Sequence, residues 1–181
     1  MKALSAAALA TLVGLAHPAA AEAPRVSAED RIAIGDLIAG IGLHADQGEW
    51  DRLAAAFAGE VTTDYVSLFG GSPATQPRDA LIAGWRGLLP GFDATQHLIG
   101  HVQVDVQGSA ARARSYVRAT HRIGSELWTV GGLYTHELTR SPAGWQVTHM
   151  RFTLQYEEGD RGLVAMAARR ACATGAAPAA R

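Results

Sequence analysis

The stretch that decides the fold is ARARSYVRATHRI, residues 111–123. Small or apolar side chains alternate with arginines and other polar side chains, which is the period of a β-strand with two different faces. Alanine, serine, valine and histidine form one face, from Ala111 to His121, and four arginines mark the other. We predict a strand that buries its small-residue face and exposes its arginine face to solvent or to a partner.

Segments with the same period lie on both sides of this strand. Residues 126–140 and 145–156 alternate in the same way, and short turns precede them at residues 124–125 and 141–144. Long segments joined by short turns predict an antiparallel meander. Residues 95–106 predict one further continuous strand. Its predicted faces are His97, Ile99, His101, Gln103 and Asp105 on one side and Leu98, Val102, Val104 and Val106 on the other.

The first half of the chain has a helical period instead. Ser27 followed by two acidic residues is typical of a helix start, and apolar residues then recur every three or four positions up to Ile41. Further helices are predicted over residues 49–58 and 77–90, with a short strand over residues 61–68 between them. Helices followed by a sheet predict an α+β fold with the helices on one face of a curved sheet.

The two ends of the chain are expected to lie outside the folded domain. Residues 1–21 have a positive start, an apolar run and a small-residue end, the layout of a signal peptide cleaved near Ala21. This layout predicts a periplasmic or secreted protein with no stable membrane insertion after processing. The expected organisation is a linker over 22–26, a domain over 27–157 and a C-terminal helix and loose tail over 158–181, loose above all in the alanine-rich 171–181.

Composition narrows the classes of function. With 16 basic and 17 acidic residues, the chain has a formal net charge of −1, which argues against a nucleic-acid binder. Hydrophobic residues make up 48%, enough for a packed core. The single cysteine, Cys172, excludes an intrachain disulfide and a multi-cysteine metal site.

Polar residues within apolar patterns are the candidates for chemistry. An aspartate beside a histidine can fix the imidazole tautomer and stabilise its protonated form. Asp46 and His97 are among the candidates, although spacing along the chain does not show which of these groups meet. Tyrosine hydroxyls can polarise a carbonyl group or hold a water molecule. The remaining candidates are Tyr65, His121 and Tyr134.

Each candidate has a structural alternative. Asp46 can cap the helix that follows it, His97 and His101 can form a metal pair, and His121 can be a hydrogen-bonded core histidine. The arginine face of residues 111–123 can be a solvated surface or an oligomer contact. The four tryptophans are expected mainly in the core.

Several motifs occur together in a specific order. They are Asp46 with residues 48–53, Asp64-Tyr65, residues 95–100, residues 120–122, residues 131–135 and Gly144-Trp145. In this order they resemble the SnoaL-like group of the nuclear-transport-factor-2-like superfamily, which includes the scytalone dehydratases and the hexachlorocyclohexane dehydrochlorinases. The resemblance covers residues 27–157.

The resemblance implies roles for individual residues. Asp46 and His97 would form the catalytic dyad, Tyr65 would line the substrate site, and His121 would be a second active-site histidine. The candidates for substrate binding are Tyr134, Trp128 and Arg140, the last near an arginine that the dehydrochlorinases use. The chain also departs from the scytalone dehydratases, since Ala45 replaces a water-holding tyrosine and Gly132 and Tyr134 replace their serine and asparagine substrate contacts.

The resemblance also implies a fold and a class of activity. The expected fold is a cone-shaped α+β barrel, three to four N-terminal helices packed in a curved, mainly antiparallel sheet around an apolar pocket. The expected function is a lyase of the dehydratase kind or an isomerase, acting on a small apolar or cyclic substrate without a metal or organic cofactor. A non-catalytic small-molecule binding module is the alternative, and a structural dimerisation domain is a third. The expected partners are a small-molecule ligand and a second or third copy of the chain, in a homodimer or homotrimer through the sheet face.

Overall fold

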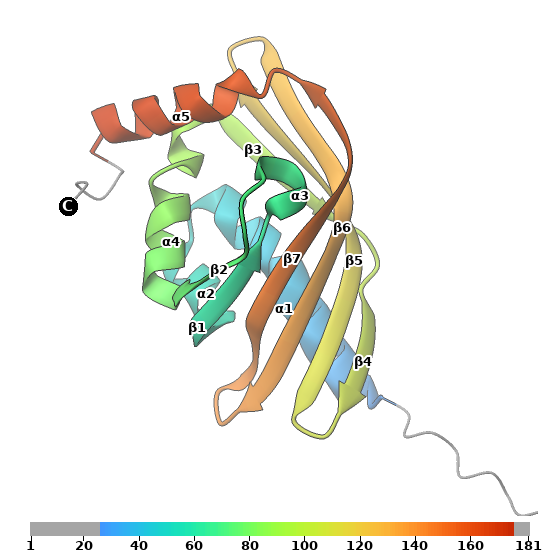
Figure 1. Ribbon diagram of the computed structural model, residues 1–181. Helices are drawn as coiled ribbons and strands as arrows, with labels where there is room; N and C mark the ends of the chain where they lie inside the picture. The colour runs from blue at the N-terminus through green and yellow to red at the C-terminus, as the bar shows by residue number, and fades with distance from the viewer. Residues whose placement is uncertain (1–25, 176–181) are drawn as a thin grey trace, which may run out of the picture.

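The computed structural model describes residues 26–175, which form helices and one large sheet (Figure 1). The helices are α1 (Ala28–Gln47), α2 (Trp50–Ala55), α3 (Val66–Phe69), α4 (Arg78–Arg86), the 3-10 helix η1 (Leu89–Gly91) and α5 (Gly162–Ala173). The strands are β1 (Phe57–Asp64), β2 (Ala74–Pro77), β3 (Ala94–Ile99), β4 (Gln103–Gln107), β5 (Ala110–Ile123), β6 (Glu126–Ser141) and β7 (Gly144–Gly159).

The sheet has the strand order β2-β1-β7-β6-β5-β3, and β4 also pairs with β5. Only β1 and β7 pair in parallel among the described strands, so the sheet is mixed and mainly antiparallel. It curves around α1 without closing, and α2 and α4 lie beside α1 on the same side (Figure 1). The predicted α+β fold with helices against a curved sheet is confirmed.

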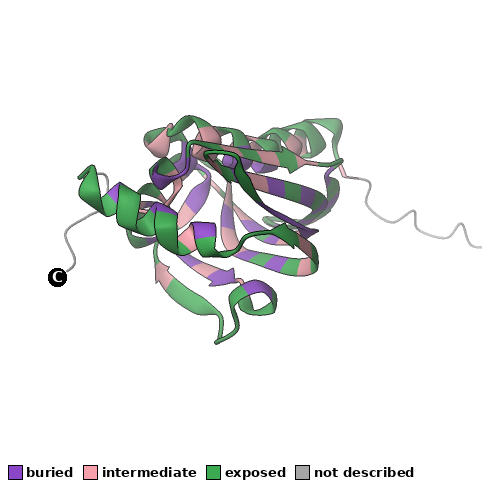
Figure 2. Cartoon of the chain, turned by 90° about the horizontal axis from the view of Figure 1, so that it is seen from above, coloured by how far each residue is buried: buried purple, intermediate pink, exposed green. Residues whose placement is uncertain are grey.

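The predicted meander is formed by β5, β6 and β7. Strand β5 pairs with β6 along its whole length, from Ala110 opposite Thr139 to Ile123 opposite Glu126. Its small-residue face is buried and its four arginines are exposed, as the alternation predicts. The same alternation shows as stripes of buried and exposed residues along the strands in Figure 2.

The prediction of one continuous strand over residues 95–106 is wrong. The chain leaves strand geometry at residues 100–102, where the backbone N–H of Gly100 donates to the carbonyl oxygen of Tyr116. After this break the alternation resumes one position out of phase. Leu98 is therefore exposed, whereas Val102 and Val104, which were predicted to share its face, are buried.

Several predicted boundaries in the helical half also shift. Helix α2 ends at Ala55 and strand β1 begins at Phe57, which pairs with Val147 of β7 and is fully buried in the main core. The predicted strand over 61–68 ends at Asp64, and a short helix, α3, follows it. The predicted helix over 77–90 is divided into α4 and η1, and the edge strand β2 before it was not predicted.

The C-terminal helix α5 packs across one end of the sheet, against η1 (Figure 1). Leu163, Ala167 and Ala171 are buried, so the expectation that the chain is loose from residue 171 onward is wrong for residues 171–173. The predicted signal peptide and residues 176–181 lie outside the described residues. Between residues 26 and 175, no helix is both long enough and apolar enough to cross a bilayer.

Candidate functional site

Asp46 and His97 meet where the last turn of α1 lies against β3. One carboxylate oxygen of Asp46, Oδ1, accepts hydrogen bonds from His97 Nδ1 and from Thr95 Oγ1, each at 2.7 Å. The other oxygen, Oδ2, accepts from the backbone N–H of His97, also at 2.7 Å. Three donors from one strand therefore fix the orientation of a single carboxylate.

Local sequence explains this close approach. Ser27 caps the start of α1 by accepting from the Asp30 N–H, and Gly48 ends the helix in the left-handed region with φ 66°. Gly42 lies on the helix face that contacts β3, where an added Cβ would come within 2.9 Å of the His97 Cβ. The glycine therefore lets the helix backbone lie close enough for Asp46 to reach the strand.

The pair is largely shielded from water, since the Asp46 and His97 side chains are 9% and 14% exposed. Burial alone would raise the pKa of the Asp46 carboxyl. The hydrogen bonds and charge of His97, with help from Thr95, outweigh that effect and hold the pKa of Asp46 below its ordinary value. Asp46 is thus an ionised acceptor near neutral pH.

An ionised acceptor at Nδ1 selects the tautomer of the neutral imidazole. The proton lies on Nδ1, and Nε2 keeps a free lone pair. His97 also lines a cavity between α1 and the sheet. A nitrogen with a free lone pair beside a cavity can take a proton from a bound molecule.

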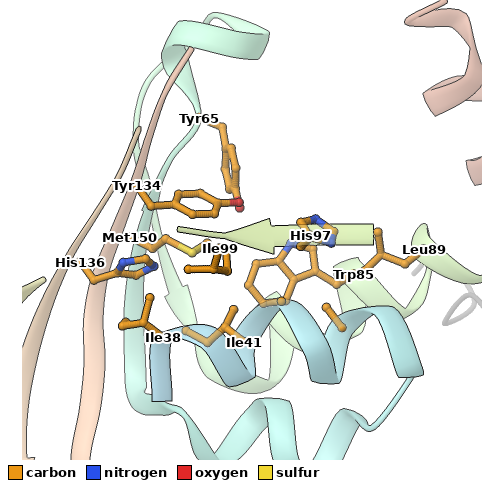
Figure 3. A pocket seen from close by; sticks show the side chains of 12 residues that line it. Ile38, Ile41, Tyr65, Trp85, Leu89, His97, Ile99, Tyr134, His136 and Met150 are labelled. Atoms are coloured by element: carbon orange, nitrogen blue, oxygen red, sulfur yellow. The ribbon is translucent and has the colours of Figure 1, made fainter. Parts of the chain in front are cut away.

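The cavity has a volume of about 60 Å³. It is enclosed mostly by apolar side chains, with a tyrosine pair on one side and a histidine at each end (Figure 3). The apolar lining residues include Ile38, Ile41, Trp85, Leu89, Ile99 and Met150, and the polar ones are Tyr65, His97, Tyr134 and His136. An engineered apolar cavity of about 150 Å³ holds benzene, so this cavity suits a smaller molecule unless its walls move.

Tyr65 and Tyr134 converge on the cavity, and their hydroxyl groups lie next to each other (Figure 3). Burial raises the pKa of Tyr65 well above its ordinary value, and the adjacent Tyr134 raises it further. Burial also raises the pKa of Tyr134. Both phenols stay protonated at neutral pH, so the pair has a hydrogen to donate to an oxygen in the cavity.

His121 lies behind His97 and does not belong to the cavity lining. The two rings meet edge to face with centroids 5.6 Å apart, and the other side of His121 packs on Trp128 at 4.6 Å. His121 Nδ1 lies 3.3 Å from the Trp128 carbonyl oxygen, to which it donates. Burial lowers the pKa of His121 to about 4, so its ring is neutral.

Two of the predicted substrate-binding residues do not line the cavity. The Trp128 Nε1–H donates to Glu157 at 2.6 Å, which fixes the indole behind His121. Arg140 forms an ion pair with Asp30, and its guanidinium carbon lies 4.4 Å from the centroid of the Trp145 ring. Arg140 therefore contacts the first turn of α1 and not the cavity, because this end of β6 lies beyond the cavity.

The alternatives drawn from sequence can now be compared with the contacts. Asp46 does not cap α2, whose N-cap residue is Glu49. His101 is exposed in the break between β3 and β4. Over residues 26–175, no three histidine, cysteine or acidic side chains cluster as metal ligands would.

Sequence reasoning missed His136 and Trp85 as cavity residues. His136 occupies an inward position on β6, one of the positions that the alternation assigns to the core. Trp85 lies on α4 among apolar residues. Nothing in the sequence pattern distinguishes such residues from ordinary core, although a histidine at an inward strand position is a signal worth following.

Comparison with solved structures shows the same architecture. A protein from Kribbella flavida is 28% identical, with a TM-score of 0.69 over 80% of this chain and 97% of its own. A scytalone dehydratase-like protein from Novosphingobium aromaticivorans is 22% identical, with a TM-score of 0.62 over 74% of this chain and 89% of its own. A type 2 hexachlorocyclohexane dehydrochlorinase is 20% identical, with a TM-score of 0.61 over 75% of this chain and 95% of its own. These last two likenesses concern the fold alone.

Sequence comparison identifies the family. Among curated proteins, no sequence matches the chain. The family model of the SnoaL-like domain matches residues 26–151, which include both Asp46 and His97. Since this match spans most of the chain, the protein belongs to the family of SnoaL-like domain proteins.

Proposed function

We propose that this protein is an exported, cofactor-independent lyase of the dehydratase kind, or an isomerase, in which His97 is the general base. The observation that carries the proposal is the hydrogen bond between His97 Nδ1 and Asp46, with the same ring lining an apolar cavity. A positioned base of this kind contributes about 10²–10⁴-fold to the rate of proton transfer.

The proposed reaction begins at a carbon next to a carbonyl group. His97 Nε2 removes a proton from that carbon, and the electron pair of the C–H bond forms an enolate. In a dehydratase, the enolate then expels a hydroxyl group from the adjacent carbon, which leaves as water with the proton from His97. In an isomerase, the substrate carries a C=C bond conjugated with the enolate, and the proton from His97 returns to the far carbon of this dienolate as the double bond shifts.

The tyrosine pair is proposed to stabilise the enolate oxygen. Tyr65 and Tyr134 both line the cavity and both remain protonated. A hydrogen bond aimed at a developing oxyanion in a dry site stabilises the transition state more than the ground state. His121 is proposed as a positioning residue, because it packs on His97 from behind.

Exchange of carbon-bound hydrogen with solvent tests this proposal without knowledge of the natural substrate. Acetone, a ketone smaller than benzene, is incubated with the protein in deuterium oxide, and loss of the signals of the hydrogens next to the carbonyl is followed by proton NMR. We expect the wild-type protein to accelerate exchange, His97→Gln to abolish the acceleration, and Tyr65→Phe to reduce it at least tenfold. Folding of each variant is checked by circular dichroism.

The same experiment decides between catalysis and simple binding. Equal exchange rates for the wild type and His97→Gln would remove His97 from the mechanism. Binding of the ketone without any acceleration would favour the non-catalytic binding module.

A further inference from the structure

His136 is a buried polar side chain that the proposed reaction does not use. It is 1% exposed, and its Nδ1 has no hydrogen-bond partner within the described part of the chain. A buried polar atom without a partner lowers stability, because it has given up its hydrogen bonds to water. The side chain also lines the cavity, so its ring borders the space that a bound molecule would occupy.

We propose that His136 forms a second polar subsite in the cavity, opposite His97, which binds a neutral hydroxyl or carbonyl group of the ligand. Figure 3 shows the ring extending from β6 toward Met150 and Ile38, at the other end of the cavity from His97. This inference deepens the proposed function, since it rests on the same cavity and specifies the ligand that the cavity takes.

The sheet register sets the spacing of the two histidines. His97 lies opposite Ala119 of β5. Ala119 in turn lies opposite Val130 of β6, six residues before His136. The two histidines are therefore separated by two strand spacings across the sheet, roughly 10 Å, and by a further offset of roughly 20 Å along the strands. The ring of Tyr134 is much nearer, with its centroid 5.3 Å from that of His136. The ligand class is therefore a small molecule with one polar group at the tyrosine pair and a second at His136.

The charge state of His136 favours a neutral group. Burial, with a further contribution from the charge of His149, lowers the pKa of His136 to about 3, so the ring is uncharged at neutral pH. A neutral imidazole has one donor and one acceptor nitrogen, and it can serve a carbonyl or a hydroxyl group. It provides no positive charge to offset the burial of a carboxylate.

Ser115 provides a matched control. It lies on β5, opposite Tyr134, on the same inner face of the sheet, and it is 3% exposed. Its Oγ also has no hydrogen-bond partner among residues 26–175, but the side chain does not line the cavity. Removal of the Ser115 hydroxyl therefore tests whether loss of any unpartnered buried polar atom on this face changes ligand binding.

The test compares two unreactive probes smaller than benzene, propan-1-ol and propane-1,3-diol, which differ by one hydroxyl group. Dissociation constants are measured by NMR titration with ¹⁵N-labelled histidine. We expect the wild type to bind the diol about tenfold more tightly than propan-1-ol, the effect of one buried hydrogen bond, with a shift of the His136 ring nitrogens. His136→Leu, or His136→Met if the leucine variant does not fold, is expected to abolish this preference, and Ser115→Ala is expected to keep it.

Three results would overturn the proposal: equal affinity of the wild type for the two probes, a preference that survives in His136→Leu, or no binding of either probe. The His97→Gln variant separates failure of the subsite from failure of the proposed function, because this variant is expected to lose catalysis and to retain the preference for the diol. A protein that prefers the diol yet catalyses no exchange has the subsite without the catalytic activity.

Discussion

The Nδ1 atom of His97 lies 2.7 Å from the Oδ1 atom of Asp46, although the two residues are 51 positions apart in the sequence. The contact joins the end of α1 to β3, and Thr95 completes it from the same strand.

The first prediction concerns Thr95, which donates to the same carboxylate oxygen as His97. Thr95→Val removes that hydrogen bond and leaves Asp46 freer to rotate. We expect the exchange rate with acetone to fall about tenfold, and Asp46→Asn to lower it by about 10²–10⁴-fold because the ionised acceptor is lost. Thr95→Ser retains the hydroxyl and is expected to behave as the wild type. If Thr95→Val has full activity, Asp46 does not depend on this contact for its position.

The second prediction compares two glycines of α1. Alanine in place of a helical glycine usually stabilises a protein by about 0.5–1 kcal/mol. Gly35→Ala is expected to do so, since a Cβ there meets no atom within 4 Å. Gly42→Ala is expected to lower both stability and exchange rate, because its Cβ would lie 2.9 Å from the His97 Cβ. Urea unfolding and the exchange assay check both variants, and a fully active Gly42→Ala would contradict the proposed role of close packing.

The third prediction is loss of stability in mild acid. The pKa of His121 is lowered to about 4 and that of His136 to about 3, from 6.5 in the unfolded chain, in each case chiefly by burial. Below about pH 6.5 the unfolded chain therefore binds protons that the folded chain does not, and stability falls as the pH falls toward 4. Each histidine contributes a slope of up to about 1.4 kcal/mol per pH unit.

Urea unfolding between neutral pH and pH 4 measures this slope. His136→Leu is expected to reduce it by about half, because one of the two histidines is removed. His101→Gln is the control, since His101 is exposed and its replacement is expected to leave the slope unchanged. A free energy of unfolding that does not change over this range would show that the two buried histidines are not held neutral.

The sequence predicted those parts of the fold in which a single periodicity runs without interruption. The alternation of residues 111–123 gives the correct inner and outer faces of β5 because both sides of that strand are paired. The same reasoning failed at residues 100–102, where the register with β5 shifts by one residue between Ile99 opposite Val117 and Gln103 opposite Arg114, which changes the phase. Periodicity carries no information about such a shift, since the register depends on a distant strand.

The site was less accessible to sequence reasoning. The pairing of Asp46 with His97 came from the resemblance, because spacing along the chain cannot show that a helix end meets a strand. Arg140 was assigned from the resemblance, because it lies near the position of an arginine that the dehydrochlorinases use, but its ion pair with Asp30 holds it away from the cavity. His136 was overlooked, because only the three-dimensional structure shows that its inward position faces an open space rather than other side chains.

The central claim is that Asp46 prepares His97 as a base facing the cavity. Measurement of the His97 tautomer tests this claim most directly. Two-bond ¹H–¹⁵N correlation spectra distinguish a protonated ring nitrogen from one with a free lone pair, at a pH where the ring is neutral. The account predicts the proton on Nδ1 and a free Nε2 in the wild type, and loss of this strict preference in Asp46→Ala. A wild-type His97 with its proton on Nε2 would contradict it.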